Sequence, residues 1–123
     1  MQVIKSVVIL GLLISSLIAN AEDRGKAYVS NQEGGVSIIN LNTMETEGSI
    51  DIQAKNPRGI GITEDGHYLI TANKDDDNLS VIDLTTNQFV KHISVGKNPE
   101  FVRVFKGQVF VSTEPASTGK PPV

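Results

Sequence analysis

Short runs of apolar residues, separated by turn-forming residues, make up most of the chain after residue 25. The runs at 68–72 and 79–84 are rich in Val, Ile and Leu and are bounded by Gly, Asn and Asp, as β-strands are. No run in this part of the chain places its apolar residues at the period of an α-helix. The pattern therefore predicts an all-β fold of short antiparallel strands joined by tight turns.

The pattern of strands repeats after about 40 residues. The segment AYVSN at 27–31 returns as LITAN at 69–73, and VSIINL at 36–41 returns as LSVIDL at 79–84. The pair Asn56-Pro57 returns as Asn98-Pro99. Four strands per repeat at this period are typical of a β-propeller, in which each repeat forms one blade. We therefore expect an all-β partial β-propeller built from four-stranded antiparallel blades.

The strands of a blade are called A to D in chain order, with A innermost. The glycines of the segment Gly59-Ile60-Gly61-Ile62 suit an inner strand, where neighbouring sheets converge. We expect residues 22–113 to form strands BCD, ABCD and AB of three successive blades. This amounts to about two blades of a ring of about seven, within the range of four to eight that propellers use. The predicted strands are 26–30, 36–41 and 47–52, then 59–63, 68–72, 79–84 and 89–95, then 101–105 and 108–113.

The first 21 residues have the layout of a secretory signal peptide. Lys5 precedes an uncharged apolar run at 6–18, and Ala19 and Ala21 are the small residues that a signal peptidase recognises. A retained membrane anchor is the alternative, but the run is shorter than the ~20 apolar residues that cross a bilayer. We expect cleavage after Ala21, a periplasmic or secreted protein, and no stable membrane insertion afterwards.

Composition excludes several classes of function. The chain has no cysteine, which rules out disulfides, thiol nucleophiles, cysteine zinc sites and covalently attached haem. Its 11 basic and 14 acidic residues give a net charge of −3, without the basic footprint of a nucleic-acid-binding protein. We expect no nucleic-acid partner, no metal and no cofactor.

About two blades are too few to bury each other's apolar faces. Repeat arrays need about three units, and a shorter array leaves apolar faces open at its ends. The chain could be part of a longer product, assemble into a ring, or depend on a partner. Joining the AB end of one copy to the BCD start of another would give a five-stranded blade with strand B duplicated, which disfavours assembly of the chain into a ring. We expect a truncated propeller that needs its remaining blades or a protein partner, and a disordered or loop tail at 114–123.

Several segments together resemble the YVTN-type propeller repeat. They are Tyr28-Val29-Ser30-Asn31, the run at 61–69 and the run at 93–99. The resemblance covers nearly all of the chain after residue 21, and it implies a periplasmic or surface protein with a propeller similar to the cytochrome d1 haem domain. His67 departs from the repeat, which usually has Arg or Lys there.

Chain direction predicts one candidate functional face. The D-to-A and B-to-C connections lie at the same end of the blades, and loops on a rigid scaffold are the usual place for binding groups. Arg58 and Glu100 hold the same repeat position, and we interpret them as an ion pair between blades. We interpret the three consecutive aspartates at 75–77 as a solvated acidic turn rather than a calcium site, because calcium needs spaced ligands. The candidate ligand-binding residues are Asn56, Arg58, Lys74, Asp75, Asp77, Asn98 and Glu100.

No grouping in the sequence predicts catalysis. His67 and His92 fall on an outer turn and an outer strand, so neither is expected to ligate haem at the axis. The aromatic residues Tyr28, Tyr68, Phe101, Phe105 and Phe110 have core spacings, and we interpret them as packing residues. The sequence favours an exported binding or scaffold module without catalysis of its own. The alternative is a piece of a propeller enzyme or redox protein, lactonase-like or haem d1-like, whose active site lies in missing blades.

Overall fold

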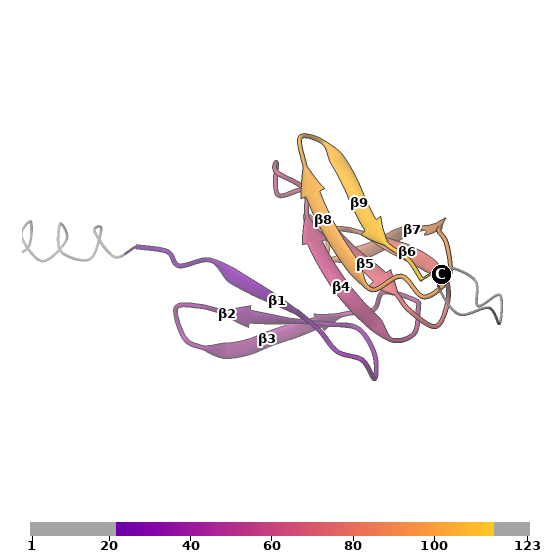
Figure 1. Cartoon of the computed structure of the whole chain (residues 1–123). Helices are drawn as coiled ribbons and strands as arrows, with labels where there is room; N and C mark the ends of the chain where they lie inside the picture. Colours follow the sequence, from indigo (N-terminus) through magenta and orange to yellow (C-terminus); the bar gives the residue numbers. More distant parts are fainter. Residues whose placement is uncertain (1–21, 115–123) are drawn as a thin grey trace, which may run out of the picture.

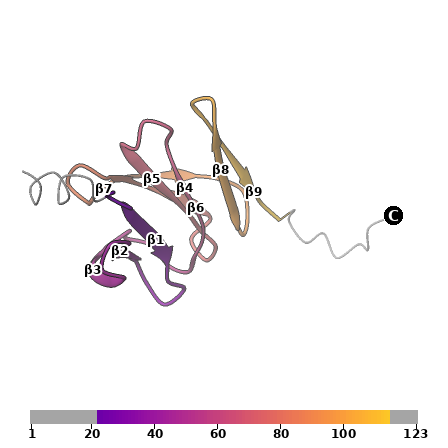
Figure 2. The same cartoon turned by 90° about the vertical axis from the view of Figure 1, so that its left-hand side faces the viewer.

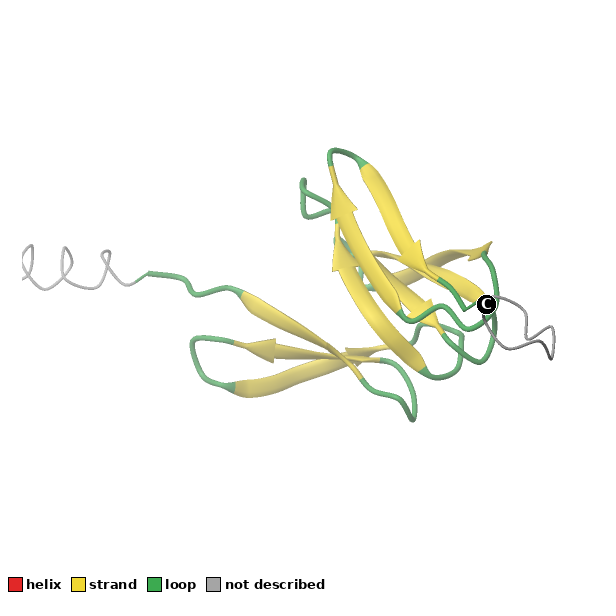
Figure 3. Ribbon diagram, in the orientation of Figure 1, coloured by secondary structure: helices red, strands yellow, loops and turns green. Residues whose placement is uncertain are grey.

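The computed structural model describes residues 22–114, which contain nine β-strands and no helix (Figure 3). No helix in this described range is therefore long and apolar enough to cross a membrane. The expected signal peptide at 1–21, and the expected tail except Glu114, lie outside the described residues. The strands are β1 (Lys26–Ser30), β2 (Val36–Asn40), β3 (Glu45–Ile50), β4 (Pro57–Ile62), β5 (Tyr68–Asn73), β6 (Asn78–Asp83), β7 (Gln88–Ser94), β8 (Phe101–Phe105) and β9 (Gln108–Ser112).

Hydrogen bonding divides these strands into three antiparallel sheets in chain order. Blade 1 is β1-β2-β3, blade 2 is β4-β5-β6-β7 and blade 3 is β8-β9. The three sheets follow one another in space, with blade 2 between the other two (Figures 1 and 2). The prediction of an all-β partial propeller is confirmed.

Two apolar clusters join the blades. Successive side chains of a strand point to opposite faces, so Leu69 of β5 packs toward blade 1 while Ile70 packs toward blade 3. Blade 2 is thus covered on both faces, and β5 and β6 are buried along almost their whole length. We call the face that a blade turns toward the preceding blade its leading face, and the opposite one its trailing face. The first cluster comprises Val36, Ile38, Ile50, Ile52, Leu69 and Ile82, and the second Ile70, Ala72, Leu79 and Val102.

The inner strands β4 and β8 touch almost backbone to backbone. A Cβ atom added to Gly59 would lie 2.6 Å from the carbonyl oxygen of Glu100 and 2.8 Å from the amide nitrogen of Val102. A Cβ atom on Gly61 would lie 3.0 Å from Cγ1 of Val102. The expectation that these glycines mark a crowded inner strand is confirmed, because no side chain fits between the two strands.

The phenylalanines of blade 3 are not packed as the sequence suggested. Phe101, Phe105 and Phe110 are 58%, 52% and 53% exposed. They alternate with residues such as Val102 that pack on blade 2, so they lie on the trailing face, where no described residue covers them. Tyr68, at 41% exposure, also departs from the expected packing, whereas Tyr28 is half-buried against the first cluster.

The turns between strands C and D are tighter than the sequence indicated. β3 begins at Glu45, two residues before the predicted strand, because the amide of Met44 closes a turn onto the carbonyl oxygen of Asn40 at 2.7 Å. Met44 has a left-handed backbone with φ of 60°, and Asn87, at the same place in blade 2, has φ of 56°. Asparagine adopts this region readily and methionine does not, so of these two left-handed residues only Asn87 has a type that indicates the conformation.

Candidate functional site

The connections between D and A strands and between B and C strands gather at one end of the blades. They are residues 31–35, 51–56, 74–77 and 95–100, and Glu114 follows β9 at the same end. Antiparallel order places them together, because every second connection of such a sheet lies at the same end. We call this set the loop face. It holds most of the predicted site residues and several polar contacts between blades.

Asn56 and Asn98 turn the chain into the inner strands β4 and β8. Both have left-handed backbones, with φ of 51° and 47°, and each precedes a fully buried proline. Asparagine is one of the few residues that tolerate this conformation. The repeated Asn-Pro pair therefore has a local structural reason, and it carries an amide side chain to the loop face in both places.

Asp77 holds the connection between blades 2 and 3. One carboxylate oxygen accepts a hydrogen bond from the backbone amide of Asn98 at 2.9 Å, and the other pairs with the Lys97 ammonium at 2.7 Å. These contacts lower the pKa of Asp77, the Lys97 hydrogen bond having the largest effect, and they raise the pKa of Lys97. Asn98 in turn donates from Nδ2 to Glu114 at 2.8 Å.

Glu100 pairs with Lys74, not with Arg58. The Lys74 ammonium lies 2.7 Å from the Glu100 carboxylate, and this hydrogen bond lowers the pKa of Glu100 and raises that of Lys74. The expected Arg58–Glu100 ion pair is wrong. Arg58 is exposed and contributes its carbonyl oxygen, which accepts a hydrogen bond from the Ser30 hydroxyl at 3.3 Å. Lys74 follows β5 directly, and its flexible side chain reaches Glu100 in the connection just before β8. The alignment of the repeats does not show that these two residues are close.

The three consecutive aspartates bind three different neighbours. Asp75 accepts a hydrogen bond from Nδ2 of Asn56 at 3.3 Å, and Asp76 accepts one from the backbone amide of Lys55 at 2.8 Å. Asp77 bonds to the next connection, as described above. Residues 22–114 contain no group of three His, Cys, Asp or Glu side chains that could hold a metal ion. The turn thus braces the loop face rather than only facing solvent.

An open polar hollow of about 430 Å³ lies where the loops of blades 1 and 2 meet. Asn56 lines this hollow, but its Oδ1 is buried, and it has no hydrogen-bond partner among the described residues. The accessible chemistry of the lining comes from two carboxylates, which accept hydrogen bonds, and one ammonium group, which donates them. The hollow is lined by Gln32, Glu33, Ala54, Lys55, Asn56 and Asp75.

A buried polar network that was not predicted from the sequence lies beneath the loop face. Nδ2 of Asn73 donates to Oγ of Ser80 at 2.9 Å, and that hydroxyl donates to the carbonyl oxygen of Ile52 in blade 1 at 2.7 Å. Asn31 and Ser37 make the same contact in blade 1, at 2.8 Å. The sequence contains an indication of this network, because the same Asn (31 and 73) and the same Ser (37 and 80) recur in the repeat. The network joins blades and is not open to a ligand, since Asn73 and Ser80 are fully buried.

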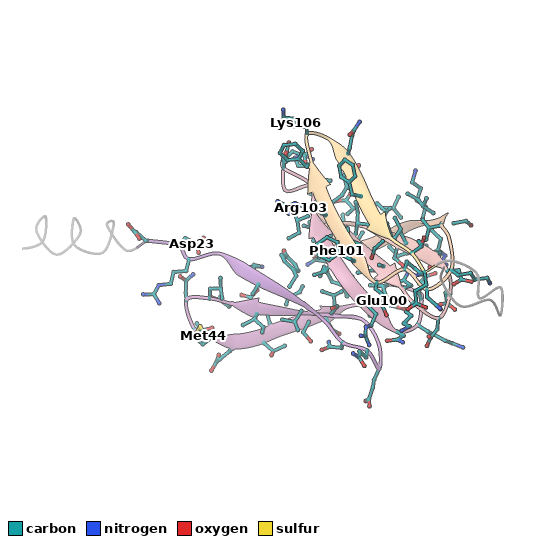
Figure 4. All side chains as sticks on the ribbon, viewed as in Figure 1. Asp23, Met44, Glu100, Phe101, Arg103 and Lys106 are labelled. Carbon is teal, nitrogen blue, oxygen red and sulfur yellow. The ribbon has the colours of Figure 1, made fainter. Side chains whose placement is uncertain are left out.

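The remaining candidates lie away from this face. His67 is in the turn before β5 and His92 is on β7, where its ring lies 4.6 Å from that of Phe89. Figure 4 shows Glu100 at the loop-face end of β8, with Arg103 and Lys106 farther along toward the opposite turn. The structure thus brings together Asn56, Lys74, Asp75, Asp77, Asn98 and Glu100, and it turns Arg58 outward. Chemically, the hollow offers acceptors to a small polar molecule that donates hydrogen bonds.

Comparison with known proteins supports a propeller-like fold. Hydrazine synthase from Kuenenia stuttgartiensis is similar over 74% of this chain, with 26% identity and a TM-score of 0.69. A protein of unknown function from Desulfotomaculum acetoxidans is similar over 76%, with 14% identity and a TM-score of 0.65. Dihydro-heme d1 dehydrogenase NirN in complex with DHE is similar over 76%, with 21% identity and a TM-score of 0.55.

The matched region is a minor part of each of these structures. The chain spans 26%, 32% and 21% of their respective lengths. No family model and no curated protein matches the sequence. The similarity therefore establishes a propeller-related, cytochrome d1-like architecture, while the YVTN assignment stays a prediction.

Proposed function

We propose that this chain is an exported propeller section that acts as a binding or scaffold module, without catalysis of its own, and that its loop face is the recognition surface. The observation that carries the proposal is the open hollow between blades 1 and 2, whose lining includes the acidic residues Glu33 and Asp75. Propeller loops are held by rigid sheets, which keeps such a group in place before a ligand arrives.

The chemistry of the hollow favours an amine-bearing ligand. Glu33 and Asp75 are acidic, and Lys55 is the one basic residue of the lining, so the hollow has an excess of negative charge. An ammonium group donates hydrogen bonds and would suit the carboxylates of Glu33 and Asp75, the second of which is held by Nδ2 of Asn56. The ligand class that follows is a small primary amine or an amino acid.

The test is a titration of the full chain with L-lysine and methylammonium, followed by amide chemical shifts in NMR. We expect saturable shifts at Lys55, Asn56 and Asp75, and their loss in Asn56→Gly, which preserves the left-handed backbone. Asn98→Gly is the matched control, because it makes the same change at the other Asn-Pro pair. Unchanged shifts with both amines, or equal effects of the two variants, would contradict the proposed site.

Export is part of the same proposal. The layout of residues 1–21 supports cleavage after Ala21 and a periplasmic or secreted location. Expression of the full chain in a bacterium, followed by fractionation and intact mass measurement, tests it. We expect a periplasmic product that begins at Glu22, and a membrane-bound product of full mass would refute it.

A second candidate function rests on the similar structures. Two of them are named as hydrazine synthase and dihydro-heme d1 dehydrogenase, which are redox enzymes by name. In this alternative the chain is a piece of a redox propeller, or of a lactonase-like enzyme, whose reactive centre lies in other blades. The DNA downstream of the coding sequence separates the two: an open reading frame that continues the repeat with His or carboxylate residues near the axis favours the enzyme piece, and its absence favours the binding module.

A further inference from the structure

The tripeptide Lys-Asn-Pro occurs twice, at 55–57 and 97–99, and each copy leads the chain from one blade into the inner strand of the next. The asparagines of the two copies make equivalent contacts. Nδ2 of Asn56 donates a hydrogen bond to Asp75, in the connection that follows strand B of blade 2, at 3.3 Å. Nδ2 of Asn98 donates one to Glu114, which follows strand B of blade 3, at 2.8 Å. The two blade junctions are therefore built alike at their asparagines.

The lysines of the two copies have different surroundings. Lys97 pairs with the carboxylate of Asp77 at 2.7 Å, and Asp77 belongs to the B-to-C connection of the preceding blade. Counted back along the aligned C strands, the corresponding residue of blade 1 is Gly34, which has no carboxylate. Accordingly, the ammonium group of Lys55 has no ion-pair partner among residues 22–114. One junction thus supplies its own anion to the lysine, and the other does not.

The open hollow of about 430 Å³ lies at the junction whose lysine is unpaired. Lys55 lines it together with Glu33 and Asp75, and neither acid forms an ion pair with the lysine. Three different connections supply these side chains: Glu33 comes from the B-to-C connection of blade 1, Asp75 from that of blade 2, and Lys55 from the connection between the blades. The hollow therefore presents one cation and two carboxylates to a small molecule that enters it.

We propose that this hollow binds the zwitterion of an α-amino acid, with the carboxylate on Lys55 and the ammonium group on Glu33 and Asp75. The carboxylate of the ligand does for Lys55 what Asp77 does for the lysine of the next junction, and the ammonium group donates charge-assisted hydrogen bonds to the two acids. The inference rests on the proposed function and narrows its ligand class, because a simple amine would leave Lys55 without an anion. Lys55 is thus the residue that distinguishes an amino acid from an amine.

Glycine and methylammonium are the probes, because glycine carries both charges and methylammonium carries only the cation. The full chain is titrated with each at neutral pH and constant ionic strength, and the amide chemical shifts of Lys55 and Asp75 in NMR give the dissociation constants. We expect glycine to bind at least about threefold more tightly, as an additional exposed ion pair would cause. Equal dissociation constants would overturn this inference and leave the amine site intact, whereas no binding of either probe would overturn the proposed function as well.

Lys55→Met tests the residue that is assigned to the carboxylate. The change removes the cation and keeps a long side chain, so it should weaken glycine binding at least about threefold. It should not weaken methylammonium binding, because it takes a positive charge away from a site for a cation. Lys97→Met is the matched control, since it makes the same change in the second copy of the tripeptide, and it should leave both dissociation constants unchanged. Equal losses for the two probes in Lys55→Met, or equal losses of glycine binding in the two variants, would overturn the assignment.

Discussion

β4 and β8 hold the same position in successive blades, yet their surroundings differ completely. β4 is in close contact with β8, so its trailing positions are glycines. β8 has no described neighbour on its trailing side, and Phe101 is 58% exposed while the adjacent Val102 is 6% exposed. The comparison shows that burial in this fold depends on the next blade and not on the strand itself. Each prediction below contrasts two positions whose surroundings differ.

The largest effect is expected at the covered inner strand. Gly59→Val would place a branched side chain where even Cβ lies 2.6 Å from a backbone oxygen, so the two blades must separate. We expect a loss of roughly 3 kcal/mol or more in the free energy of unfolding. Phe101→Thr, at the equivalent uncovered position, should cost less than about 1 kcal/mol in the monomer. Urea unfolding followed by circular dichroism measures both, and equal losses would invalidate the comparison.

The buried network offers a second contrast between blades 2 and 1. Asn73→Ala leaves the fully buried Ser80 hydroxyl without its donor, whereas Asn31→Ala affects a half-buried contact with Ser37. An unsatisfied buried polar group costs about 1–3 kcal/mol, and a partly exposed one costs less because water replaces the partner. We expect a loss near the top of that range for Asn73→Ala and a clearly smaller one for Asn31→Ala. Urea unfolding measures both losses. A larger loss in Asn31→Ala than in Asn73→Ala would show that the blade 1 contact is covered in solution.

The fold could be predicted because the same types of residue recur at equivalent positions of each repeat. The glycines at 59 and 61 indicate a crowded inner strand. The turn residues mark where strands end, and the strand at 79–84, which is apolar on both faces, indicates a sheet covered on both sides. The surroundings of the phenylalanines could not be predicted in the same way. Their spacing shows which face of blade 3 they occupy, but not whether that face has a neighbour.

The site was predictable only in part, for a related reason. Chain direction placed Asn56, Asn98 and the aspartate turn at one end of the blades. It did not specify which cation meets Glu100, because Lys74 and Arg58 belong to the same blade and the distance depends on flexible side chains. The left-handed Met44 is a similar case, since nothing in its side chain favours that conformation.

The ion pair at the junction of blades 2 and 3 gives a third, smaller contrast. Lys74→Met should move the pKa of Glu100 up toward its ordinary value, because the Lys74 hydrogen bond is the main cause of its depression. Arg58→Met should move it less, since Arg58 acts only through a weaker charge interaction. Carboxyl chemical shifts recorded against pH measure both pKa values. A larger rise in the pKa of Glu100 in Arg58→Met than in Lys74→Met would mean that Arg58 is its main partner, as the sequence suggested.

The smallest effect is expected from pH acting on the exposed Asp77–Lys97 pair. The pKa of Asp77 is lowered in the folded chain, so its contribution is present above the ordinary aspartate pKa and is lost as the pH falls through the folded value. The pKa of Lys97 is raised, so its contribution is present below the ordinary lysine pKa and is lost as the pH rises through the folded value. Thermal melting should thus be flat near neutral pH and decline slightly at both extremes. Asp77→Asn should reduce both declines. Asp51→Asn is the control, because Asp51 is an exposed carboxylate without a lysine partner among the described residues. An identical pH profile in the two variants would mean that the Asp77–Lys97 pair contributes nothing to stability.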